Sequence, residues 1–217
     1  HSDLRRQRQM CIRDRRWYSF LNFQKKNLAS VKKVISPSAS SKNDIRNYFD
    51  YPSKNISVIW NGINLDDCKF HQREKFNSNF VTIISSDVPM KNLKTVLKAI
   101  CLLKQDGLNA KLTIIGDLRE ENKNLINNLG LANDIDYKSK LPREELIKSL
   151  YNADIGIAPS SYEGFGFPLV EMIATGLPVI VSDKASLPEL AGNAGLIFDS
   201  EDSGDLKNKM NELIGNK

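Results

Sequence analysis

The chain has 217 residues, of which 41% are hydrophobic and 26% are charged, and this length is enough to bury the core of one domain or slightly more. Its three cysteines have no metal-ligand spacing and its two histidines lie far apart, so we expect no metal, no cofactor and a reducing, cytoplasmic setting. No apolar run reaches the ~18 residues that a membrane-spanning helix needs.

The net charge of +5 arises largely from basic residues among the first 33 positions, such as Arg5, Arg6, Lys32 and Lys33. A solvated surface explains such a cluster, and an anionic membrane or a nucleic acid are the alternatives. Because no nucleic-acid-binding motif surrounds these residues, we expect no nucleic-acid partner. Peripheral contact with the inner face of a membrane stays open.

The first residues also raise a question of origin. Residues 10–15, with the sequence MCIRDR, resemble a translated adapter from sequencing libraries. We therefore expect residues 1–16 to be non-native and leave them out of the fold. A genuine basic arm is the alternative.

The next part of the chain is expected to form short elements. Residues 17–50 should contain a helix, a strand at 33–36 and a second helix that begins near Ser40, whose hydroxyl suits a helix cap. A strand at 56–60 is followed by a polar, irregular stretch. The segment 51–79 is therefore predicted to connect two domains.

A regular alternation of strands and helices begins at residue 80 and continues to the end of the chain. Strands are expected at residues 80–84, 111–115, 135–137, 154–158, 178–182 and 195–198. Helices are expected at residues 92–105, 120–129, 143–151, 168–175, 187–191 and 203–214. Apolar strands that alternate with helices indicate an α/β fold with a parallel sheet covered on both faces, which binds ligands at the carboxyl ends of its strands.

The loop after the strand at 154–158 carries the strongest signal for function. Gly164 and Gly166 allow a close approach of the backbone to a ligand, and Pro168 suits the first position of the following helix, which ends before Gly176. Free N–H groups and the positive end of the helix dipole attract anions such as phosphate. A tight strand-to-helix turn with two glycines is the structural alternative.

Two carboxylates bracket this loop. Glu163 precedes the loop glycines and Glu171 lies one turn into the helix, and a carboxylate accepts hydrogen bonds from vicinal hydroxyls such as those of sugars. The plainer roles are a favourable charge near the helix N-terminus for Glu171, which contributes ~0.3–1 kcal/mol, and a solvated loop carboxylate for Glu163.

The stretch from Pro159 to Glu171, PSSYEGFGFPLVE, resembles the E-x7-E motif of retaining glycosyltransferases of the GT-B fold, family four. The following ATGLPVI, residues 174–180, agrees with that family too. The resemblance covers residue 34 to the end and is most specific over 154–198. It implies an expected fold in which 80–217 is the Rossmann-like, nucleotide-sugar-binding C-terminal domain.

The resemblance also implies that residues 17–50 are the last elements of the N-terminal domain. The half that binds the acceptor, where the family carries an important histidine, is then missing from this sequence. We expect the fragment alone to be inactive.

The resemblance implies a role for each matching residue. Glu171 would hold the ribose hydroxyls, Glu163 would contact the transferred sugar near its anomeric carbon, and Lys91 would neutralise the diphosphate. Reaction on the front face of the donor, with no established enzyme nucleophile, would retain the anomeric configuration. The other expected donor-binding residues are Gly164, Phe165, Gly166, Phe167, Gly116 and Leu141.

Two departures from the family pattern concern the donor site. Ser85 and Ser86 stand where the family has Gly-Arg, and a charge-assisted contact of that kind is worth ~1.5–3 kcal/mol. Lys94 could replace this cation but is expected to be solvated. Lys138 and Ser139 stand where a glycine precedes the base pocket.

The sequence thus predicts a retaining glycosyltransferase that moves a hexose from a nucleotide-diphosphate sugar to a glycan or lipid-linked acceptor. A non-catalytic nucleotide-sugar-binding module is one alternative, suggested by the lost arginine. A GT-B sugar-nucleotide epimerase is another, and the E-x7-E wording argues against it.

Overall fold

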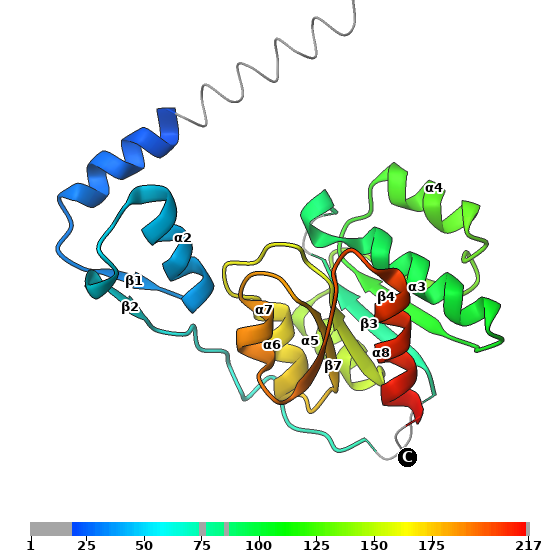
Figure 1. The fold of residues 1–217 in the computed structure, drawn as a ribbon. Coiled ribbons are helices and arrows are strands. Elements are labelled where there is room, and N and C mark those ends of the chain that lie inside the picture. Colours follow the sequence, from blue (N-terminus) through cyan, green and yellow to red (C-terminus); the bar gives the residue numbers. More distant parts are fainter. Residues whose placement is uncertain (1–18, 74–76, 85–86, 216–217) are drawn as a thin grey trace, which may run out of the picture. The chain divides into compact units, whose positions relative to one another are not determined.

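The structure is a computed structural model that describes residues 19–73, 77–84 and 87–215. It divides into two compact units, His1–Trp60 and Asn61–Lys217 (Figure 1). The suspected adapter segment, residues 1–16, lies outside the described residues. Within the three described ranges, no helix is both long and apolar enough to cross a bilayer.

The first unit contains a helix at residues 19–29 and a small parallel sheet. Its further elements are β1 (Val34–Ser36), α2 (Ala39–Phe49), η1 (Ser53–Asn55) and β2 (Ile56–Val58). β1 pairs in parallel with β2. Helix α2 is capped by Ser38, whose hydroxyl accepts a hydrogen bond from the N–H of Ser41 at 3.0 Å. The cap thus lies two residues before the predicted Ser40, because the helix already begins at Ala39.

The second unit holds the predicted alternation of strands and helices. Its strands are β3 (Asn79–Ile83), β4 (Lys111–Ile115), β5 (Ile135–Lys138), β6 (Ile155–Ala158), β7 (Val179–Ser182) and β8 (Gly195–Phe198). Its helices are η2 (Pro89–Lys91), α3 (Leu93–Gln105), α4 (Glu120–Asn128), α5 (Arg143–Tyr151), α6 (Phe167–Ala174), α7 (Leu187–Ala191) and α8 (Ser203–Gly215). Every boundary expected from residue 80 onward agrees to within one residue.

The six strands form one parallel sheet in the order β5-β4-β3-β6-β7-β8, with a hydrophobic core on each face. Successive strand residues point to opposite faces, so Phe80 packs beneath α3, α4 and α8 while Val81 packs beneath α5, α6 and α7. Figure 1 shows these two groups of helices about the sheet. The prediction of a doubly covered, Rossmann-like sheet is confirmed.

Residues that precede β3 pack on the second unit through buried polar and apolar contacts. Cys68 lies in the core beneath α5, α6 and α7. The guanidinium of Arg73 donates to the carbonyls of Leu150 at 2.8 Å, Ala153 at 2.9 Å and Thr175 at 3.0 Å. Leu150 lies in the last turn of α5, Ala153 just after that helix and Thr175 at the end of α6, and burial lowers the pKa of Arg73. The expected connection 51–79 is thus shared between the two units.

Thr82, in the centre of β3, offers a test of how the core is packed. Among the described residues, its Oγ1 is the one buried side-chain oxygen without a hydrogen-bond partner. Valine has nearly the same shape without the hydroxyl, so Thr82→Val should raise the free energy of unfolding by ~1 kcal/mol. Urea denaturation measures this change.

Thr82→Ser is the matched control, since it keeps the hydroxyl and loses a methyl group. It should lower the free energy of unfolding by ~1 kcal/mol. A valine variant that is no more stable than the wild type would show that the hydroxyl is satisfied in solution.

Candidate functional site

The strand order reverses between β3 and β6, the two central strands. β3 continues through α3 toward β4 on one side, and β6 continues through α6 toward β7 on the other. Because α3 and α6 cover opposite faces, the loops after β3 and β6 leave the same edge of the sheet and diverge. Open α/β sheets bind their ligands at such a point. The N–H of Ser161 donates to the carbonyl of Met90 at 2.8 Å and ties the two loops together.

An ion pair between these loops brings together the two residues predicted to be catalytic. Lys91 ends η2, and its Nζ lies 2.5 Å from Oε1 of Glu163 in the loop after β6. The side chains are only 16% and 20% exposed. The hydroxyl of Ser160 donates to the same carboxylate oxygen at 2.9 Å. An ammonium has three N–H donors, so this bond leaves two for a ligand.

Buried hydroxyl groups set the shape of the loop after β6. Ser182, at the end of β7, donates to the carbonyl of Ser160 at 2.5 Å. Ser186, just before α7, donates to the carbonyls of Glu163 at 2.9 Å and Phe165 at 2.6 Å. The loop therefore keeps a defined backbone around Glu163. The sequence pattern did not single out either serine, and the available signal was that Ser182 ends a buried strand and Ser186 follows it closely.

Helix α6 begins at this loop without a side-chain cap. Gly166 is its N-cap with a φ of 110°, a conformation that favours glycine, and a Cβ there would lie 3.1 Å from Leu187. The N–H of Phe167, the first residue of the helix, has no intrahelical partner and can donate to a ligand. Pro168 has no N–H, and the N–H of Leu169 donates to the carbonyl of Gly166 at 3.0 Å. Pro168 is the second residue of the helix, whereas the sequence pattern predicted the first. The helix ends before Gly176 as predicted, and Gly176 has a left-handed φ of +74°.

Two phenylalanines flank Gly166, and they differ in burial. Phe165 is buried and Phe167 is half exposed, and their rings meet edge to face at 5.3 Å. Gly164, which precedes them, is half-buried. The four expected donor-binding residues of the loop thus lie together at the start of α6.

Glu171 is held by a cation that the sequence analysis did not identify. Arg143, the first residue of α5, places Nη1 at 2.6 Å from Oε1 of Glu171. Burial alone would lower the pKa of Arg143, but the hydrogen bond and charge of Glu171 raise it. Arg143 also contacts Asp67, with Nε 3.6 Å from Oδ2, and Cys68, with Nη2 3.5 Å from Sγ. Burial raises the pKa of the Cys68 thiol, which therefore stays neutral. The two glutamates thus have separate cations.

Gly116 and Leu141 occupy the loops after β4 and β5. A Cβ on Gly116, whose φ is +137°, would collide with the carbonyl oxygen of Ile84, so the close approach of β3 already requires glycine here. Leu141 is partly buried against the core beneath α5, α6 and α7. Ser139 donates to Asp117 at 2.5 Å and joins the two loops to each other. These contacts hold Gly116 and Leu141 in place without involving the Lys91–Glu163 pair.

The sequence pattern led to two expectations about positive charge near the site, a missing cation at Ser85 and Ser86 and a solvated Lys94. Ser85 and Ser86, where the family pattern has a cation, lie outside the described residues. Lys94 is exposed on α3. Across the part of the chain that the structure describes, no group of three or more His, Cys, Asp or Glu side chains could hold a metal ion.

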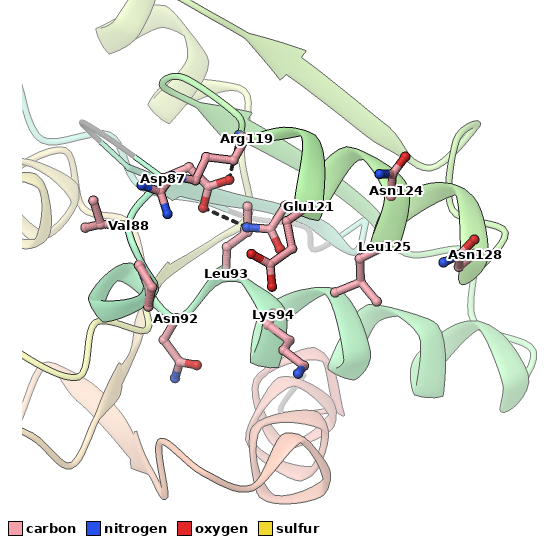
Figure 2. Close-up of a pocket in the computed structure, with 12 residues that line it drawn as sticks. Asp87, Val88, Asn92, Leu93, Lys94, Arg119, Glu121, Asn124, Leu125 and Asn128 are labelled. Carbon is pink, nitrogen blue, oxygen red and sulfur yellow. Dashed lines mark hydrogen bonds between the residues drawn. The ribbon is translucent and has the colours of Figure 1, made fainter. Parts of the chain in front are cut away.

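A pocket of about 430 Å³ lies between the start of α3 and α4 (Figure 2). None of the predicted site residues lines it. The buried carboxylate of Asp87 accepts the N–H of Arg119 at 2.8 Å, a bond drawn in Figure 2, and also accepts from Nδ2 of Asn122 at 2.7 Å. These bonds fix the loop after β3 to α4, so the pocket borders the candidate site without belonging to it.

Two models of protein families match the chain, one over each of its two parts. A family model described as "Glycosyl transferases group 1" matches residues 66–217. A model described as "Glycosyltransferase Family 4" matches residues 1–67. The first match includes every residue of the candidate site.

Curated relatives include two bacterial enzymes. The MMP alpha-(1->4)-mannosyltransferase of Mycolicibacterium hassiacum is 32% identical over 184 residues, which are 83% of this chain and 44% of the relative. The O-antigen chain mannosyltransferase B of Escherichia coli is 29% identical over 189 residues, which are 81% of this chain and 50% of the relative. The chain therefore spans about half the length of these relatives.

A solved structure shows the same fold. The sucrose-phosphate synthase of Thermosynechococcus elongatus superposes with a TM-score of 0.77 over 92% of this chain and 53% of that protein. At 19% sequence identity, this match supports the arrangement of the elements and not a shared substrate.

The packing at Gly116 can be tested with alanine. Gly116→Ala should destabilise the protein by more than ~4 kcal/mol or prevent folding, because its methyl group would collide with the backbone carbonyl of Ile84, directly after β3. Gly130→Ala is the matched control, since Gly130 has a φ of +67° and open space around its Cβ position. That variant should lose only ~1–2 kcal/mol from backbone strain. Equal losses of stability in the two variants, measured by thermal unfolding, would contradict the collision.

Proposed function

The chain belongs to the family of glycosyl transferases group 1, and from that premise we propose that it forms the donor-binding part of a retaining GT-B glycosyltransferase. The donor is a nucleotide-diphosphate sugar and the group transferred is a hexose. The acceptor is a glycan or a lipid-linked sugar, and the N-terminal domain of the whole protein binds it. The cytoplasmic side of a membrane is the proposed setting.

The observation that carries this proposal is the Lys91–Glu163 pair beside the uncapped start of α6. A diphosphate leaving group gains negative charge as its bond to the anomeric carbon breaks. The ammonium of Lys91 and the N–H of Phe167 at the start of α6 are fixed before the substrate arrives, so they can stabilise this charge without reorganising. A loop that only turned the chain would not need a cation against a carboxylate from another loop.

Glu163 is suited to contact the transferred sugar near its anomeric carbon. Lys91 and Ser160 both hold Oε1, which fixes the carboxylate group and leaves Oε2 to accept hydrogen bonds from sugar hydroxyls. The pair also places a carboxylate and a cation within 2.5 Å of each other. One ligand that offers hydroxyls next to a diphosphate matches that combination, and this is the structure of a nucleotide sugar.

Glu171 is suited to hold the ribose. Arg143 occupies its Oε1, so Oε2 stays available for a ribose hydroxyl. The rigid guanidinium keeps the carboxylate in one orientation. The relatives from M. hassiacum and E. coli are both named mannosyltransferases, which favours mannose among the hexoses.

Calorimetric titration tests the proposal directly. The chain should show saturable binding of at least one UDP-, GDP- or ADP-sugar, with mannose and glucose tested for each base. Lys91→Met should weaken binding of the nucleoside diphosphate by at least about tenfold, because one charge-assisted hydrogen bond contributes ~1.5–3 kcal/mol. It should leave the weak binding of the nucleoside unchanged.

Lys94→Met is the control for charge, since Lys94 is an exposed lysine three residues further along. Its binding should equal that of the wild type. If the wild-type chain binds none of these sugars, the proposed function is wrong.

The role of Glu171 has its own test. The wild type should bind the preferred ribonucleoside diphosphate about tenfold more tightly than its 2′,3′-dideoxy analogue, as expected for a hydrogen bond to a carboxylate. Glu171→Ala should bind both equally, whereas Glu144→Ala, at an exposed carboxylate of α5, should keep the preference. A preference that survives in Glu171→Ala would assign the ribose to other residues.

A further inference from the structure

Asn92 follows Lys91 directly, and its carboxamide bonds to two other loops and to the first turn of α3. Its Nδ2 donates to the carbonyl of Ser200 at 2.8 Å and to that of Pro159 at 3.1 Å. Its Oδ1 accepts the hydroxyl of Thr95 at 2.7 Å. Thr95 also reaches the carbonyl of Ser200 at 3.3 Å. Ser200 and Thr95 are buried, so water competes little for these bonds.

The position of Asn92 makes this use of its side chain unusual. It is the N-cap residue of α3, where an asparagine oxygen commonly accepts an N–H of the first helical turn. Here no side-chain cap hydrogen bond forms. Its φ of 52° and ψ of 33° are left-handed, a conformation that asparagine tolerates better than most residues. The side-chain N–H groups of Asn92 thus bond to the loops, while its Oδ1 and its carbonyl accept from the hydroxyl and the N–H of Thr95 in the first turn of α3.

The partners of Asn92 and Lys91 lie at one edge of the sheet, in the loops after β3, β6 and β8. Pro159 immediately precedes Ser160, whose hydroxyl bonds to Glu163. Asn92 therefore joins the residue after Lys91 to the segment that fixes Glu163. In Figure 2 its side chain points away from Asp87, so its contacts are separate from those that hold the loop to α4.

We propose that Asn92 is a positioning residue for donor binding, which holds the loops after β3, β6 and β8 in the register that sets Lys91 against Glu163. This inference rests on the proposed function and adds a residue to it. Asn92 acts through the two loops, and Lys91 carries the contact with the diphosphate. Only a carboxamide supplies two N–H donors for the two carbonyls and an acceptor for Thr95 from one short side chain.

Two substitutions of Asn92 separate the effect of its side-chain amide from the effect of its backbone conformation. Asn92→Gly keeps the left-handed conformation and removes the carboxamide. Asn92→Asp keeps the oxygen that accepts from Thr95. It replaces the NH₂ group, which donates to two carbonyls, with an oxygen that cannot donate. Asn124→Asp, on the exposed face of α4, makes the same change of charge elsewhere. The unmodified chain and the three variants are titrated with UDP, GDP and ADP, and with uridine, guanosine and adenosine.

Both Asn92 variants should bind the preferred diphosphate about tenfold more weakly and its nucleoside within about twofold of the wild type, since a tenfold change in affinity corresponds to ~1.4 kcal/mol. The Asn124→Asp control should match the wild type. A loss of thermal stability with diphosphate binding unchanged, or an equal loss of diphosphate and nucleoside binding, would overturn the positioning role.

Hydrogen exchange at the amide of Ser161 decides the same question without a ligand. This N–H bonds to Met90 across the two loops at 2.8 Å and should exchange about tenfold faster in Asn92→Gly, while amides of α4 keep their rates. An unchanged rate at Ser161 would overturn the inference. Failure of the wild type to bind any diphosphate would instead refute the proposed function, and the exchange rates would still show whether Asn92 sets the loops.

Discussion

The parallel pairing of β3 with β6 is the constraint on which the candidate site depends. Phe80, Val81 and Thr82 lie opposite Ile155, Gly156 and Ile157, so both strands end at the same level. Gly156 allows α6 to pack closely on these strands, because a Cβ at this position would lie 2.7 Å from the sulfur of Met172 in α6. With α3 on one face and α6 on the other, the loops that leave these strands can exchange contacts and still leave a ligand site between their helices.

Uncharged hydrogen bonds, more than the ion pair, hold those loops. A partly exposed salt bridge contributes ~0–1 kcal/mol, whereas a buried polar group that loses its partner costs ~1–3 kcal/mol. Ser182, Ser186 and Asn92 together satisfy five carbonyls of the loops after β6 and β8. These hydrogen bonds fix the shape of the loops, and the fixed loops hold Lys91 and Glu163 in position. Its charges are therefore available for a ligand.

The sequence predicted well the features that depend on neighbouring residues. Apolar runs and helix signals located the elements of the second unit, and the loop glycines with Glu163 and Glu171 identified the edge that holds the candidate site. Contacts between distant residues were not accessible in this way. Arg143 and Glu171 are separated by 28 positions and Asn92 and Ser200 by 108, and no local pattern marks such partners. The packing of Gly116 against β3 likewise becomes visible only when the strands are placed side by side.

The central claim is that a nucleotide sugar binds where the loops after β3 and β6 meet. An amide NMR titration of the chain with UDP, GDP and ADP tests this most directly, because each N–H reports its own surroundings. The largest shift changes are expected at Lys91 and across residues 163–171, with α4 little affected. Changes concentrated around Asp87 and Arg119 would instead place the ligand in the pocket of Figure 2 and contradict a site where the two loops meet.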